Sequence, residues 1–196
     1  MAAFVRAATG LVRTGGPAIP HHRFQPSAAA VLQRVIATAG FVAAGALASL
    51  LATTPAGAAS NKVRVTNLSD VVFGTIANLS IDATRSQNLC LYADTASSGY
   101  NVTARGTGPG GAFQLSSGPS VLSYEVQWSS SSGQDSGVQL TPNTPLTGQA
   151  SSAAHQTCNN GPATSASLLI MLRSTALSSA TAGSYTGTLT LIVGAE

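Results

Sequence analysis

Charged and metal-binding side chains are scarce in this chain. Asp, Glu, Lys and Arg make up 8% of its 196 residues, and aromatic residues make up 5%. There are only two cysteines, Cys90 and Cys158, and His155 is the only histidine after residue 59. A zinc centre needs more soft ligands than these three side chains provide. No G-x-S-x-G motif is present either, so we expect no metal, no cofactor and no Ser-His-Asp hydrolase.

The formal charge of +3 does not describe the whole chain. Four of the nine cations precede residue 59: Arg6, Arg13, Arg23 and Arg34. The remainder carries five cations against six anions, a net charge of −1, and its cations are scattered. A chain without a basic face is not expected to bind nucleic acid.

A break in composition near Ala58 and Ala59 divides the sequence. Arg34 precedes an apolar run over residues 35–51, and a small-x-small pattern ends at Ala58. This order is typical of a secretory signal peptide. We therefore predict an N-terminal extension and signal peptide over residues 1–59, cleaved between Ala58 and Ala59 or one bond later. Residues 60–196 form the exported domain, with no membrane anchor after cleavage.

Two alternatives remain open for the leader. The apolar run has 17 residues, which is the lower limit for a membrane-spanning helix, so an uncleaved anchor is the rival interpretation. Residues 1–33 have no clear periodicity and form an unusually long preface to a signal, which raises the hypothesis that translation starts near Val31.

The two cysteines have a simple interpretation in an oxidising compartment, where they pair with each other. A Cys90–Cys158 disulfide would close a loop of 68 residues, worth about 4 kcal/mol in the chain-entropy model. Two free thiols or an intermolecular bridge are the alternatives.

Period-two alternation of apolar and polar residues recurs after residue 60 and predicts half-buried strands. The candidate strands cover residues 62–66, 71–73, 89–92, 100–105, 122–128, 138–140 and 185–193. Residues 106–111 and 129–137 are rich in Gly and Ser and are predicted to be loops. Residues 167–172 are apolar on both faces, which suits a central strand, with a buried helix as the rival. Residues 175–182 allow one helical turn. We therefore predict an all-β antiparallel sandwich.

Few residues suggest chemistry. His155 lies in a polar stretch and is expected to be an exposed loop residue. Glu125 faces outward, and the aspartates lie in turn-like contexts, so a catalytic acid pair is not expected, although such a pair meeting in space stays open. Tyr124 and Trp128 fit core packing, with a sugar-stacking platform as the alternative. We predict that the protein is not an enzyme.

Several phrases, in this order and spacing, resemble the spore coat protein U domain family, which includes subunits of archaic chaperone–usher pili. They are residues 72–74, 88–92, 99–104, 122–128, 157–158 and 182–191. The resemblance spans nearly all of residues 63–196.

The resemblance implies an immunoglobulin-like sandwich that lacks its final strand. The strand over residues 185–193 would then border an empty groove, with Tyr185, Leu189, Leu191 and Val193 on the acceptor-groove strand. Family members fill the groove first with a strand of a periplasmic chaperone, and then with a strand of the next subunit at an outer-membrane usher. The expected protein is an exported subunit of a surface pilus, fibre or coat; a secreted adhesin or carbohydrate-binding module is the alternative.

The chain departs from the family pattern at its predicted mature N-terminus. Only residues 59–62 precede the first strand-like run, whereas polymerising subunits carry a long donor segment there. Either Val63 and Val65 belong to a short donor, or the subunit donates nothing and has a tip, terminating or coat role.

Overall fold

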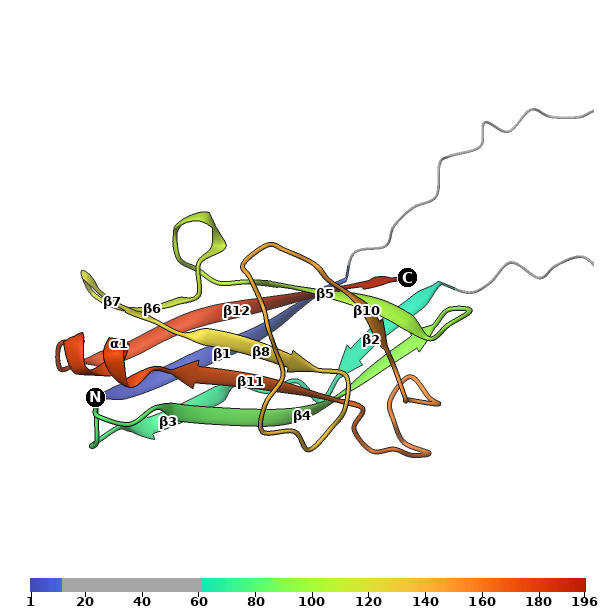
Figure 1. The fold of residues 1–196 in the computed structure, drawn as a ribbon, viewed down its shortest axis with the longest axis horizontal. Coiled ribbons are helices and arrows are strands. Elements are labelled where there is room, and N and C mark those ends of the chain that lie inside the picture. Colours follow the sequence, from blue (N-terminus) through green and yellow to red (C-terminus); the bar gives the residue numbers. More distant parts are fainter. Residues whose placement is uncertain (12–60) are drawn as a thin grey trace, which may run out of the picture. The chain divides into compact units, whose positions relative to one another are not determined.

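In the computed structural model, residues 1–11 and 61–196 are described (Figure 1). Nearly all regular structure is β. The elements in chain order are β1 (Ala2–Leu11), β2 (Lys62–Thr66), β3 (Val71–Thr75), β4 (Ala83–Asp94), β5 (Gly99–Arg105), a 3₁₀ turn (Pro109–Gly111), β6 (Gln114–Ser117), β7 (Ser120–Ser123), β8 (Glu125–Ser129), β9 (Val138–Gln139), β10 (Leu146–Ala150), β11 (Ala166–Leu172), α1 (Ser174–Ser179) and β12 (Ser184–Ala195).

The strands form two sheets. The first sheet has the order β10-β5-β12-β1-β3, with β6 and β7 attached beside β12. The second has the order β2-β4-β11-β8-β9. Every ladder among the described strands is antiparallel except that between β1 and β12, which is parallel. The predicted all-β sandwich is confirmed.

The core lies between the sheets and is built from alternate residues of the strands. Along β5, Tyr100, Val102 and Ala104 are buried and the residues between them are less so, as the period-two pattern predicts. The indole Nε1 of Trp128 donates to the Tyr100 hydroxyl at 3.1 Å, so the two largest buried rings satisfy each other's polar atoms.

The apolar segment after residue 166 is a strand and not a buried helix. β11 pairs with β4 on one side and with β8 on the other, which makes it the central strand of its sheet. A strand with neighbours on both edges and few exposed side chains reads as a continuous apolar run. The predicted helical turn follows it directly as α1.

The prediction of one strand over residues 122–128 is wrong. The segment is divided at Tyr124: β7 pairs with β6 in the first sheet, whereas β8 pairs with β11 in the second. The Tyr124 backbone N–H donates to the Phe113 carbonyl at 3.0 Å, and the two rings stack. The alternation of inward and outward side chains continues unchanged across Tyr124, so the sequence periodicity does not show that the chain passes from one sheet to the other.

Three strands had no counterpart in the sequence-based prediction: β6, β10 and β1. β10 contains Gly148 at a φ of +69°, and its register with β5 is interrupted there. β1 has the larger consequence, because it pairs along β12. The expectation that the edge of residues 185–193 is unpaired is therefore wrong for this chain.

The predicted leader falls largely on residues outside the described ranges, including the apolar run and both Ala58 and Ala59. Within residues 1–11 and 61–196, no helix is long and apolar enough to cross a bilayer.

Candidate functional site

In the first sheet, one strand position lies between β3 and β12. We use the term acceptor groove for the space bordered by these two strands, which β1 fills in this structure (Figure 1). Its borders lie far apart in sequence, since β3 covers Val71–Thr75 and β12 covers Ser184–Ala195. Residues 61–196 thus build a sandwich with one strand position that they do not fill themselves.

β1 runs along the whole groove. It pairs in parallel with β12, from Ala2 opposite Ser184 to Leu11 opposite Val193. On its other edge it pairs antiparallel with β3 over Ala2–Val5.

Backbone bonds at its N-terminal end fasten it further. The Ala2 N–H donates to the Gly183 carbonyl at 3.1 Å, and the Ile76 N–H donates to the Met1 carbonyl at 2.7 Å. Further along β1, the Ala7 N–H donates to the side-chain Oδ1 of Asp70, the residue before β3, at 3.2 Å. β1 is therefore bound by backbone contacts on both edges.

Removing β1 would leave both borders of the groove with unpaired backbone. Among the described strands, β1 is the only one with which β3 forms a ladder, and β12 would lose its partner from Ser184 to Val193. Unpaired edges of this length invite pairing with another chain. Without β1, the acceptor groove would therefore have two backbone edges free to pair with another strand.

The inward side chains of β1 complete the core. Ala3 is 2% exposed and Val5 is 0% exposed, whereas Arg6 is exposed. The small Ala3 lies at a register shift, opposite Gly74, which adopts a φ of +69°. At that φ an L side chain would be strained, so the bulge depends on glycine. The groove thus takes a small residue at one position and a β-branched residue two positions later.

The sequence-predicted acceptor-strand residues all lie on β12 with buried side chains: Tyr185, Leu189, Leu191 and Val193. The Tyr185 hydroxyl donates to the Thr181 carbonyl at 3.0 Å, which gives the buried ring a partner for its polar atom. Their strand is flanked by β5 and β1. They belong to the same core cluster as Ala3 and Val5.

The first strand-like run of the predicted exported domain is β2, which lies in the second sheet and not beside β1. Val63 and Val65 lie on β2, which pairs along its length with β4 in the second sheet. Val63 is buried and belongs to the core. Of the two interpretations of this run, the structure therefore excludes Val63 and Val65 as a free donor in this state.

The Cys90–Cys158 disulfide is present and joins β4 to the loop before β11. The two Cα atoms are 5.9 Å apart. Close by, the Ser165 hydroxyl donates to the Leu91 carbonyl at 2.7 Å and accepts from the Leu91 N–H at 2.8 Å. The predicted internal disulfide is confirmed, and together with Ser165 it fastens this loop to β4.

Two carboxylates, Asp82 and Glu125, meet on one guanidinium, which is the spatial pairing that the sequence analysis left open. Arg173 contacts Asp82 at 2.9 Å and Glu125 at 2.6 Å. The Ser174 N–H also donates to Asp82 at 2.7 Å. This backbone bond and then Arg173 lower the pKa of Asp82, while the Glu125 and Asp82 contacts raise the pKa of Arg173. Asp82 and Arg173 are thus held charged, whereas a general acid needs a raised carboxyl pKa.

The sugar-stacking interpretation of Tyr124 and Trp128 is wrong. Both rings are buried, Trp128 completely, and burial raises the pKa of the Tyr124 hydroxyl. His155 lies in an exposed turn, as expected. In residues 1–11 and 61–196, no group of three or more His, Cys, Asp or Glu side chains could hold a metal ion.

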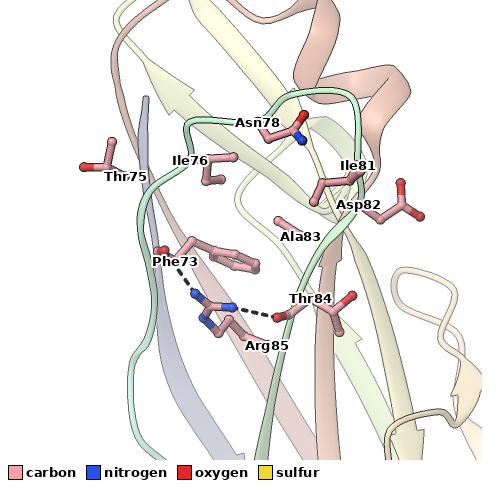
Figure 2. Close-up of a pocket in the computed structure, with 9 residues that line it drawn as sticks. All are labelled: Phe73, Thr75, Ile76, Asn78, Ile81, Asp82, Ala83, Thr84 and Arg85. Atoms are coloured by element: carbon pink, nitrogen blue, oxygen red, sulfur yellow. Dashed lines mark hydrogen bonds between the residues drawn. The ribbon is translucent and has the colours of Figure 1, made fainter.

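A hollow of about 360 Å³ lies between the end of β3 and the start of β4 (Figure 2). Phe73, Ile76 and Ile81 provide its apolar wall, and Ile81 is 60% exposed. Arg85 donates to the Phe73 carbonyl at 3.3 Å and to the Thr84 carbonyl at 3.0 Å, and its guanidinium lies 5.7 Å from the centre of the Phe73 ring. Arg85 thus covers part of the free edge of β3 with a charged group, which hinders edge-to-edge pairing there.

Comparison with known proteins adds no assignment. No protein-family model matches this chain, and no curated protein matches it. The groove and the disulfide must therefore be interpreted from their own geometry.

Proposed function

We propose that this protein is an exported, non-enzymatic structural subunit that is assembled by strand complementation into a surface pilus, fibre or coat. One observation carries the proposal. The strand that completes the sandwich, β1, comes from residues that precede the predicted signal peptide, whereas residues 61–196 leave its position unfilled. Cleavage between Ala58 and Ala59 would separate the exported domain from that strand.

β1 covers both backbone edges of the acceptor groove and part of the core. Without it, the backbone of β12 from Ser184 to Val193 would lose one ladder, and β3 would lose its ladder with β1. Ala3 and Val5 would also leave the core, exposing apolar side chains beneath them to water. A domain in this state gains stability from any strand that restores both ladders and fills the pockets.

Export supports the same function. The disulfide between Cys90 and Cys158 is typical of proteins that fold in an oxidising compartment. In such a compartment, a periplasmic chaperone would supply the missing strand first. An outer-membrane usher would then exchange it for a strand of a neighbouring subunit. The assembled subunit lies at the cell surface, without a membrane anchor of its own.

The test is to recover the protein from the surface fraction of its own cells, determine its N-terminus and measure its assembly state. We expect an N-terminus at Ala59 or the next residue, and a high-mass assembly that dissociates into subunits on denaturation. A matched pair of variants, one in β1 and one in β12, distinguishes which of the two strands the surface assembly needs. Val5→Arg leaves the surface assembly unchanged because β1 is removed, whereas Leu191→Arg abolishes it. A monomeric surface protein that still contains residues 1–11 would contradict the proposal.

A further inference from the structure

On the basis of the proposed function, we infer that β1 is a built-in occupant of the acceptor groove, which keeps the uncleaved chain closed to partner strands until the leader is removed. The inference concerns the regulation of the groove and the chemistry of the strand that it accepts. It follows from three features of β1: its position in the chain, its contacts and its side-chain pattern.

The position of β1 couples groove occupancy to processing. β1 covers Ala2–Leu11, and the predicted cleavage site between Ala58 and Ala59 lies between it and every other described strand. A signal peptidase would hydrolyse that peptide bond, using one water molecule and leaving a carboxylate on Ala58 and an amino group on Ala59. After this step β1 is no longer tethered to the groove, so it competes with other strands only at its free concentration.

The contacts of β1 explain why the tethered strand excludes others. It occupies the facing edges of both β3 and β12, so a second strand cannot form either ladder while β1 is present. A tethered segment acts at an effective concentration in the mM range. A free strand at about 10 µM would therefore be at a disadvantage on the order of 100-fold.

The side chains of β1 define which partner strand fits. The partner is a polypeptide segment that runs parallel to β12, with a small residue at the Ala3 position and a β-branched residue at the Val5 position. A long or charged side chain at the Val5 position is excluded, since that site is fully buried. The Arg6 position is exposed and tolerates change.

The experiment uses the full chain with its disulfide intact and a specific protease site introduced between residues 12 and 60. Cut and uncut samples, checked by mass, are unfolded in urea and refolded with a labelled peptide of residues 1–11 at about 10 µM. Refolding lets the tethered and free strands compete without waiting for slow dissociation. Two matched peptides carry Val5→Arg and Arg6→Ala.

We expect the cut chain to retain the labelled peptide and the uncut chain to retain on the order of 100-fold less, as the effective concentration predicts. The Arg6→Ala peptide should bind like the original, and the Val5→Arg peptide should not bind. Equal uptake by cut and uncut chains would overturn the inference while leaving the groove, and so the proposed function, intact. Equal binding of the Val5→Arg peptide would also overturn it, because binding would then bypass the groove.

A separate result would count against the proposed function as well. If the cut chain loses residues 1–11, takes up no peptide and refolds as a monomer with slowly exchanging β12 amides, the sandwich needs no added strand. If the cut chain aggregates without peptide and the original peptide prevents this aggregation, the result would support both the inference about β1 and the proposed function.

Discussion

Replacing Val5 with alanine should measure how strongly β1 contributes to the fold of the uncleaved chain. The Val5 side chain is completely buried between the sheets, in the same cluster as the inward residues of β12. The substitution removes two methyl groups, each worth about 0.8 kcal/mol in transfer from water. The space that they leave adds a cavity term, so the total loss is about 2 kcal/mol.

The assay is unfolding of the full-length, disulfide-bonded chain in urea and by heat. For a chain of this size, about 2 kcal/mol corresponds to a fall in Tm of about 4–8 °C. Arg6→Ala, one residue away and exposed, is the matched control and should change stability by less than about 0.5 kcal/mol. Val5→Thr keeps the shape but buries a hydroxyl, so it should also destabilise the chain, by about 1–3 kcal/mol.

Equal stability of Val5→Ala and Arg6→Ala, within about 0.5 kcal/mol, would contradict the buried position of Val5. β1 would then lie outside the cooperative fold, and the groove would be open in the uncleaved chain. A large effect of Arg6→Ala together with none at Val5 would mean that the opposite face of β1 is buried.

Three further predictions concern the rest of the domain. Replacing Cys90 and Cys158 together with serine should cost about 4 kcal/mol in urea unfolding, since the closed loop spans 68 residues, and an unchanged midpoint would contradict this. The pKa of Asp82 is lowered in the folded chain, so this carboxylate contributes stability above its ordinary pKa of 3.8, and the contribution is lost as the pH falls through the folded pKa. When the urea midpoint is plotted against pH, Asp82→Asn should therefore reduce its fall at acid pH. Burial raises the pKa of Tyr100 from 10.0 to about 12, so the folded chain keeps a proton that the unfolded chain loses, and stability should fall between pH 10 and 12. The part of the tyrosinate absorbance that a Tyr100→Phe variant lacks should then appear only with unfolding, and its appearance before unfolding would disprove the burial argument.

The sandwich could be predicted because most of its strands carry their burial pattern locally. The alternation of Tyr100, Val102 and Ala104 predicted β5, and the doubly apolar run predicted β11 as a central strand. The division at Tyr124 was missed because its inward side chain keeps the same phase in both sheets. Such a change is decided by tertiary contact with Phe113 and leaves no periodic signal.

The groove was predicted only in part. Its β12 border followed from the resemblance, but its occupant did not, because β1 consists largely of alanine and other small residues in a basic, leader-like context. Alanine has little intrinsic preference for strands, so this segment is a strand because the groove offers it two edges. The meeting of Asp82 and Glu125 on Arg173 is likewise nonlocal, with sequence separations of 91 and 48 residues from the arginine.

The decisive measurement is to identify which strand lies beside β12 in the exported protein. Assemblies from the cell surface would be cross-linked, digested and analysed by mass spectrometry for peptides joined to residues 184–195. We expect a peptide from another polypeptide, with small and β-branched residues at alternate positions. Recovery of residues 1–11 of the same chain, still covalently joined to the domain, would contradict it.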